Sequence, residues 1–163
     1  MPLYYTGVGS RRTPDDTLDR MTAIAERLGK RGFTLRSGGA IGADTAFEFG
    51  LTNGSSKDIY YARDATEEAI EMAMSLPGEH WQHDNLAAKL FGRNMFQVLG
   101  LDLKTPSKFL ICWTPEGRLV GGTRLAIKCA QVNNIPVFNL FHPWEDIRDE
   151  LGDLVLKLSP EPK

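Results

Sequence analysis

A turn with almost no side chains is the feature that most constrains how this chain can fold. Residues 37–44 (SGGAIGAD) follow an apolar run at residues 32–35 and precede apolar side chains at helical spacing. We therefore predict a buried strand that passes through a glycine-rich turn into a helix. Small residues let backbone N–H groups approach an anion, and the start of a helix adds partial positive charge. The turn predicts a phosphate site that includes Ser37, Gly38, Gly39 and Asp44. The plainer alternative is a tight turn that needs glycine only for its backbone angles.

The alternation of strand and helix continues along the chain. Apolar runs predict strands at residues 3–8, 32–35, 58–62, 108–113 and 135–139, and residues 154–158 can add an edge strand. Amphipathic patterns predict helices at residues 13–31, 45–51, 66–74, 85–101 and 125–132, and a short helix from residue 142. This order favours one α/β domain with a mostly parallel sheet and helices on both faces. We assign residues 1–158 to the domain and residues 159–163 to a frayed tail.

Length, charge and cysteine use narrow the class of protein. A chain of 163 residues suits one domain, and its net charge of −2 argues against a protein that coats nucleic acid electrostatically. Any nucleic-acid contact must then come from a local patch. Cys112 and Cys129 lie in apolar contexts, so we expect reduced core residues. The sequence contains neither a signal peptide nor an apolar run that could span a bilayer, so we expect a soluble, cytoplasmic protein without membrane contact.

Three predicted strands end in turns of small residues. Besides the turn at residues 37–39, the first strand ends at Gly9 and Ser10, and Gly121, Gly122 and Thr123 follow the fourth strand. In parallel sheets, ligands lie beyond the carboxyl ends of the strands. We expect the three turns to converge on one crevice that binds a nucleotide or phosphate.

These turns do not match the two common nucleotide-binding signatures. Gly7 and Gly9 have the spacing of a dinucleotide fingerprint, but Arg12 stands where the third glycine belongs. The second strand is followed by no acidic residue that would hold a ribose, and the chain has no Gly-Lys-Ser/Thr P-loop. We therefore expect no cofactor and no ATP hydrolysis of the Walker type.

Several arginines fall at the predicted ends of the loops. A guanidinium complements phosphate oxygens, and a group of arginines beside glycine turns favours phosphate recognition. For each one taken singly, the alternative is a solvated surface position. The arginines are Arg11, Arg12, Arg36, Arg93, Arg118 and Arg124.

Residues 5–11 (YTGVGSR), residues 37–44 and the pair Arg93-Asn94 together resemble the Rossmann-like domain of the DNA-processing protein A (DprA/Smf) family. The resemblance spans about residues 3–140. It implies a Rossmann-like fold, binding of single-stranded DNA in recombination, a homodimer, and help in loading a recombinase partner. The phosphate-binding residues would be Gly9, Ser10, Arg11, Ser37, Gly38, Gly39, Asp44, Arg93, Asn94, Gly121, Gly122, Thr123 and Arg124.

Arg93-Asn94 followed by residues 121–123 also resembles the related Lonely Guy phosphoribohydrolases, which cleave the N-glycosidic bond of nucleoside monophosphates. That resemblance implies a catalytic glutamate three residues after Thr123, where this chain has Ala126. Asp44 and Glu48 are the candidates to replace the missing carboxylate beside Arg93, because release of a base needs acid–base help.

The loop at residues 77–83 contains two smaller groups of candidate residues. His80, His83 and Asp84 have a spacing that can hold a metal, but no fourth ligand is evident, so we expect solvated histidines and no metal site. Trp81 can stack on a base or pack on the edge of the sheet, and we favour packing.

Three functions remain open from the sequence. The first is a DprA-like protein that binds single-stranded nucleic acid or nucleotide phosphates without catalysis. The others are a nucleoside 5′-monophosphate N-glycosidase and a non-catalytic sensor or sequestering protein for a small nucleotide. Ala126 counts against the enzyme. The helix that carries Leu86, Leu90 and Leu99 is predicted to offer an apolar surface to a homodimer.

Overall fold

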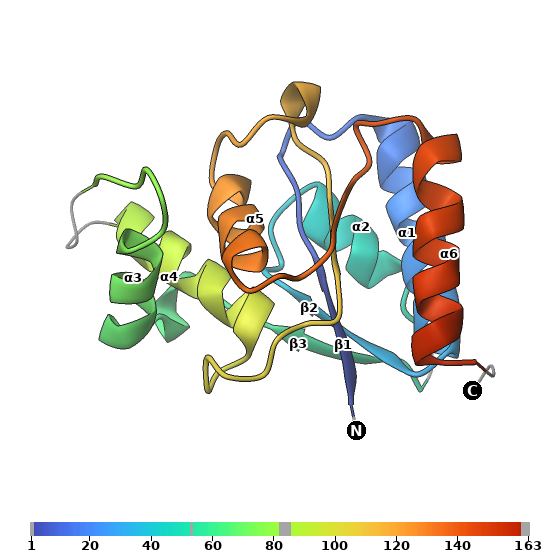
Figure 1. Ribbon diagram of the computed structural model, residues 1–163, viewed down its shortest axis with the longest axis horizontal. Helices are drawn as coiled ribbons and strands as arrows, with labels where there is room; N and C mark the ends of the chain where they lie inside the picture. Colours follow the sequence, from blue (N-terminus) through green and yellow to red (C-terminus); the bar gives the residue numbers. More distant parts are fainter. Residues whose placement is uncertain (1, 53, 82–85, 161–163) are drawn as a thin grey trace.

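A computed structural model describes residues 2–52, 54–81 and 86–160. They form three layers, with one parallel sheet between two layers of helices (Figure 1). The strands are β1 (Leu3–Gly7), β2 (Phe33–Ser37), β3 (Ser56–Ile59), β4 (Leu110–Cys112) and β5 (Val137–Asn139). The helices are α1 (Asp15–Lys30), α2 (Ala43–Phe49), α3 (Glu67–Met74), α4 (Leu86–Leu99), α5 (Thr123–Val132) and α6 (Trp144–Leu158), with two short 3-10 turns, η1 (Ala62–Asp64) and η2 (Pro115–Gly117).

The strands lie in the order β3-β2-β1-β4-β5, and every pair is parallel. Tyr5 lies opposite Leu35, and Gly7 lies opposite Ile111, so β1 is central. After β3 the chain crosses to the other side of β1, which makes the boundary between β1 and β4 the switch point of the sheet. The predicted α/β fold with a parallel sheet and helices on both faces is confirmed, and its arrangement is Rossmann-like.

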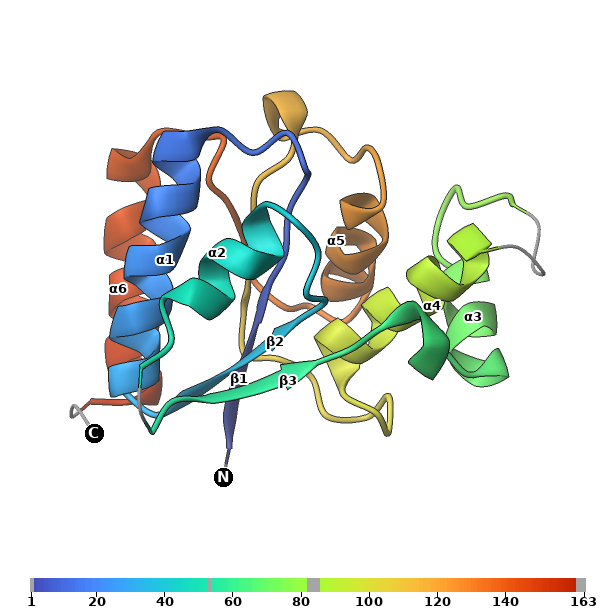
Figure 2. The same ribbon diagram turned by 180° about the vertical axis from the view of Figure 1, so that it is seen from behind.

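The two faces of the sheet form separate hydrophobic cores. Helices α1, α2 and α6 cover one face, while α4 and α5 cover the other and α3 packs on the outer side of α4 (Figures 1 and 2). Alternate side chains along β4 point to opposite faces of the sheet, which explains its unbroken apolar run. Phe109 and Ile111 enter the core under α1, α2 and α6, while Leu110 and Cys112 enter the core under α4 and α5. Cys112 and Cys129 are both free and buried, as expected.

The predicted edge strand at residues 154–158 is wrong, because this segment is the last part of α6. The buried residues of that helix, Ile147, Leu151 and Val155, recur every four residues and bind it to the α1 side of the sheet. Ser159, assigned to the tail from the sequence, is buried: its Oγ donates to the Arg31 carbonyl at 2.9 Å. Residues 161–163 lie outside the described residues.

The third strand begins and ends earlier than the sequence suggested. It pairs with β2 from Ser56 opposite Thr34 to Ile59 opposite Ser37. Pairing stops there because β2 ends at Ser37, whose carbonyl still accepts from the Tyr60 N–H at 2.9 Å. Within the described residues, no helix is long and apolar enough to cross a membrane.

Arg36 is a buried structural residue and not part of a loop end, which corrects the sequence interpretation. It is 2% exposed, and its Nη1 donates to the Thr105 carbonyl at 2.6 Å and to Ser107 Oγ at 3.2 Å. Its guanidinium carbon lies 3.8 Å from the centre of the Tyr4 ring. Burial lowers the pKa of Arg36, although nearby Tyr60 counteracts this. The side chain thus ties β2 to the segment between α4 and β4.

Replacing this arginine should therefore destabilise the fold. We expect Arg36→Ala to lower the free energy of unfolding by about 3 kcal/mol, because it removes a buried guanidinium together with its hydrogen bonds to the Thr105 carbonyl and Ser107 Oγ. Urea denaturation followed by circular dichroism measures this loss. Arg118→Ala, which removes an exposed arginine paired with Glu116, is the matched control and should stay within about 0.5 kcal/mol of the wild type. Equal midpoints for the two variants would contradict the structural role.

Candidate functional site

The turns after β1 and β2 pack against each other at the carboxyl edge of the sheet. Ser37 Oγ donates to the Gly7 carbonyl at 2.6 Å and joins the ends of the two strands. A Cβ at Gly9 would lie only 2.6 Å from the Cβ of Ala43, so glycine lets the first turn touch the start of α2. Gly42 has φ of 101°, a backbone angle that other residues rarely adopt. Two of the three predicted turns therefore form one surface.

Ser10 shapes the first turn from within. Its N–H donates to the Trp113 carbonyl at 3.1 Å, and its Oγ accepts from the Arg12 N–H at 3.0 Å. Thr13 Oγ1 donates to the Ser10 carbonyl at 2.6 Å. These bonds tie the turn to the end of β4 and leave the side chains of Arg11 and Arg12 exposed at the same edge.

Arg93 reaches the second turn from α4. Its Nη1 donates to the carbonyls of Gly38 at 3.2 Å and Tyr60 at 3.1 Å. A Cβ at Gly38 would collide with this guanidinium and would lie 2.5 Å from Gln97 Nε2, so the close approach requires glycine. Burial lowers the pKa of Arg93, and the charge of Asp44 opposes that shift. The guanidinium remains charged, as arginine does throughout proteins.

The next residue of α4 contacts the third turn. Asn94 is buried, and its Nδ2 donates to the Gly122 carbonyl at 2.8 Å. Consecutive side chains of one helix therefore hold the second and third turns, so the Arg93-Asn94 pair joins regions that are distant in sequence. Gly121 and Gly122 themselves are exposed, and Thr123, partly exposed, begins α5.

Asp44 lies inside the second turn. The residue is 5% exposed, and its Oδ2 accepts from the Ala40 N–H at 3.3 Å. Burial raises the pKa of Asp44 to about 6, although the Arg93 charge and backbone N–H groups of the turn act in the opposite direction. The carboxylate thus binds a backbone donor within the turn that the sequence analysis predicted to hold a phosphate. Near neutral pH it adds negative charge beside the turn.

Arg124 is held away from the other two turns. Its Nε and Nη2 donate to the two carboxylate oxygens of Glu79 at 3.1 and 2.8 Å, and its Nη1 donates to the Gly121 carbonyl at 2.7 Å. Lys128 and the Trp81 ring N–H also bind Glu79. Burial alone would raise the pKa of Glu79, but the hydrogen bonds from Arg124 and Lys128 outweigh it, so the pKa lies below its usual value. Arg124 thereby links the third turn to Glu79 of the segment after α3.

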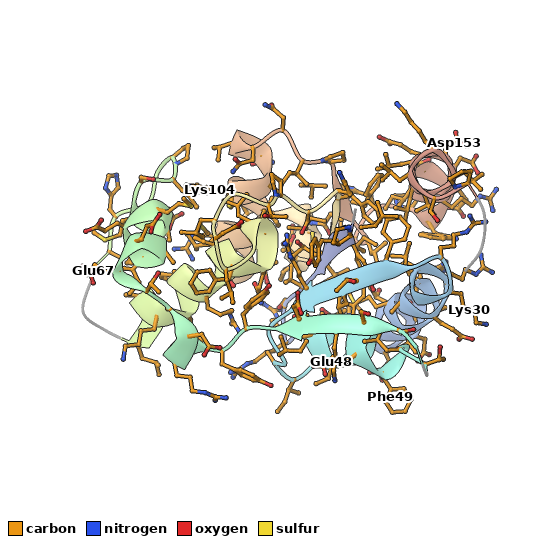
Figure 3. All side chains as sticks on the ribbon, turned by 90° about the horizontal axis from the view of Figure 1, so that it is seen from below. Lys30, Glu48, Phe49, Glu67, Lys104 and Asp153 are labelled. Atoms are coloured by element: carbon orange, nitrogen blue, oxygen red, sulfur yellow. The ribbon has the colours of Figure 1, made fainter. Side chains whose placement is uncertain are left out.

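The carboxylate candidates lie in different surroundings. Glu48, on α2, pairs with Lys57 of β3 at 2.9 Å, and its Oε1 would lie 3.8 Å from a Cβ at Gly39 (Figure 3). Ala126, at the position where the phosphoribohydrolase resemblance implies a glutamate, is fully buried in the core. No other carboxylate among the described residues replaces it on α5, because that helix has no acidic residue.

The loop after α3 carries Trp81 and His80, two of the smaller candidates named from the sequence. Trp81 packs on Phe91 of α4, with ring centres 4.8 Å apart, so it packs as favoured but on a helix instead of the sheet edge. His80 is exposed, while His83 and Asp84 lie outside the described residues. Within residues 2–52, 54–81 and 86–160, no group of three or more His, Cys, Asp or Glu residues is placed to hold a metal.

Two residues of this edge were missed in the sequence. Gln97 follows Arg93 by one helical turn and is 1% exposed; its carbonyl accepts from Thr6 Oγ1 at 2.6 Å. Gln97 lies four residues after Arg93, and this spacing could have indicated that both side chains share one face of the helix. Glu79 lies in an irregular segment, and nothing in the sequence indicated that it would meet Arg124.

Comparison with solved structures supports the Rossmann-like fold. A structure of DNA processing protein A from Helicobacter pylori, described for its mode of single-stranded DNA binding, has 16% sequence identity to this chain and a TM-score of 0.56 over 85% of it. A structure of DprA from Streptococcus pneumoniae has 18% identity and a TM-score of 0.55, also over 85% of this chain. No protein-family model and no curated protein matches.

The likeness covers only part of the two DprA proteins. It includes 65% of the Helicobacter pylori chain and 50% of the Streptococcus pneumoniae chain. At these identities it shows a DprA-like Rossmann-like fold.

The buried carboxylate of Asp44 should oppose the binding of an anion at these turns. We expect Asp44→Asn to bind an oligonucleotide roughly threefold to tenfold more tightly at neutral pH, because the variant lacks the nearby negative charge. Wild-type affinity should rise as the pH falls through about 6, where this carboxyl becomes protonated, and the variant should lack that rise. Fluorescence anisotropy over a pH series measures both effects. Weaker binding by the variant would mean that the carboxylate assists the ligand.

Proposed function

We propose that this protein binds single-stranded nucleic acid through its backbone phosphates at the carboxyl edge of the sheet. The observation that carries the proposal is the joining of two glycine-rich turns, with Arg93 at the carbonyl of Gly38 and Arg11 exposed beside them. Small residues leave the backbone accessible, and charged guanidinium groups supply donors that match phosphate oxygens.

The ligand class follows from where the donors lie. Because the net charge of the chain is −2, contacts with phosphates must come from local groups of cations, such as those at the turns. Arginine and backbone donors recognise phosphate without reading bases, which favours binding that is indifferent to sequence. The likeness to DprA, one of whose structures is described for single-stranded DNA binding, supports this choice over a duplex.

A free nucleotide is the second candidate, because one phosphate would use the same donors. A non-catalytic sensor of that kind differs from the main proposal only in ligand size. The N-glycosidase has weaker support, since Ala126 is buried and Glu48 is engaged by Lys57. A homodimer, a recombinase partner and a cytoplasmic location belong to the same proposal and rest on the resemblance to DprA.

A change at the exposed arginine of the first turn tests the proposal. We expect Arg11→Ala to weaken binding of every oligonucleotide sequence alike and to reduce the slope of log affinity against log salt by about 0.7. Arg93→Ala should weaken binding in the same way. Because Arg93 also bonds two backbone carbonyls, its variant needs a parallel urea denaturation. The control is Lys30→Ala, which removes one exposed positive charge at the end of α1 (Figure 3).

The same titrations separate the candidates. Tight binding of a mononucleotide, with no gain for an oligonucleotide, would favour the sensor. Release of free base from a nucleoside monophosphate, abolished in Glu48→Gln, would replace the proposal with the N-glycosidase. An unchanged salt slope in Arg11→Ala would contradict a phosphate contact at the first turn.

The proposed homodimer uses the first half of α4. Leu86 and Leu90 are 69% and 38% exposed, whereas Leu99, which the sequence also assigned to this surface, is buried in the core. We expect light scattering to give twice the 18.1 kDa chain mass, and Leu90→Asp to return it to the single mass. Wild-type protein that stays at the single mass at every concentration would refute the dimer.

A further inference from the structure

A groove runs between α1 and α6, away from the turns described above. It encloses about 530 Å³ and is lined on the α1 side by Arg20, Arg27 and Arg31, with Arg148 of α6 opposite. The helices lie side by side along the flank of the molecule and are seen nearly end-on in Figure 3. Four arginines line one groove in a chain whose net charge is negative.

Most of this positive charge is not neutralised by the protein. Among the described residues, neither Arg20, Arg27 nor Arg31 has a carboxylate oxygen within ion-pairing distance. Arg20 lies over the Trp144 ring at 4.5 Å, and Arg31 Nη1 donates to the Ser159 carbonyl at 2.6 Å. The lining includes one carboxylate, Asp149, which is 84% exposed and lies 3.6 Å from Arg148. The groove therefore attracts an anionic ligand.

The α1 arginines form a row that starts near the first turn. Arg20, Arg27 and Arg31 are seven and four residues apart, or about 10 Å and 6 Å along the helix. Helix α1 begins at Asp15, shortly after the exposed Arg11 and Arg12. The row thus follows Arg11 and Arg12 along the chain, with Asp15, Asp16 and Asp19 between Arg12 and Arg20.

The floor between the arginines is apolar. The lining between the arginines includes Ala23 of α1 with Leu151 and Gly152 of α6, beside larger apolar side chains of both helices, and a Cβ at Gly152 would meet no atom within 4 Å. The remaining acidic residues of α6 do not line the groove, and Figure 3 shows Asp153 on the side of α6 away from α1. An extended ligand with regularly spaced negative charges fits this row better than a compact anion.

We propose that the groove between α1 and α6 is a second contact surface for single-stranded nucleic acid, in which Arg20, Arg27 and Arg148 hold phosphates of a strand that leaves the first turn. This inference rests on the proposed function, because it assigns the path of the same ligand. The arginines along the groove, together with the likeness to a DprA structure described for single-stranded DNA binding, favour a nucleic-acid strand over an acidic segment of another protein.

The length of the oligonucleotide separates the two contact surfaces. A strand of about 5 nucleotides reaches only the turns, whereas one of about 20 nucleotides also covers the groove. We expect the double variant Arg20→Ala/Arg27→Ala to bind the longer strand about tenfold more weakly and to lower its salt slope by about 1.4. Affinity for the shorter strand should not change. Lys30→Ala, on the same helix but outside the groove, is the matched control.

Each other outcome overturns the inference. If the wild type binds both strands and the double variant matches it, the groove proposal fails while the proposed function stands. If the wild type binds neither strand, both fail together. Poly-glutamate that binds the wild type more tightly than the longer strand, and loses that binding in the double variant, would make the groove a site for an acidic peptide. A urea midpoint equal to that of the wild type shows that the variant is folded.

Discussion

The contact between α4 and the glycine-rich turns organises the carboxyl edge of this protein. Arg93 donates to the carbonyl of Gly38, and its neighbour Asn94 donates to the carbonyl of Gly122. The first bond supplies a donor to a buried loop carbonyl, and the second reaches the carbonyl of an exposed turn. Because the two side chains are adjacent on one helix, the second and third turns keep a fixed relation. Glycine at position 38 is the condition for this contact, since any side chain would displace the guanidinium.

The two carboxylates next to the turns give this edge its electrostatic character. Asp44 is buried in the second turn with a raised pKa, while Glu79 is held by two cations with a lowered pKa. Glu79 pairs with both Arg124 and Lys128, whereas Arg11 and Arg12 remain exposed. The exposed positive charge nearest to these turns therefore lies at Arg11 and Arg12 of the first turn, although the sequence suggested arginines at the ends of several loops.

Patterns that depend on neighbouring residues were readable from the sequence, and contacts between distant segments were not. The apolar run at residues 108–113 correctly predicted a buried strand, because its alternate residues enter the two cores. From the sequence, Arg36 was assigned to a loop end, because the predicted strand stopped at residue 35. Strand β2 continues to Ser37, so Arg36 lies inside the sheet and faces α4. Residues 154–158 resemble a strand when taken alone. Val155 continues the four-residue spacing of Ile147 and Leu151, and that spacing indicates a helix. The pairing of Glu79 with Arg124 joins segments 45 residues apart, which no local pattern encodes.

The most direct test of the account follows backbone amide signals of isotope-labelled protein during titration with a short oligothymidylate. If the turns bind phosphate, the largest shifts should occur at residues 8–12 and 38–42, and they should shrink as salt is added. Residues 62–74, on the far side of α4, should keep their positions. Shifts confined to that distant region, or no shifts at concentrations where anisotropy reports binding, would contradict the claim that the glycine-rich turns hold the ligand.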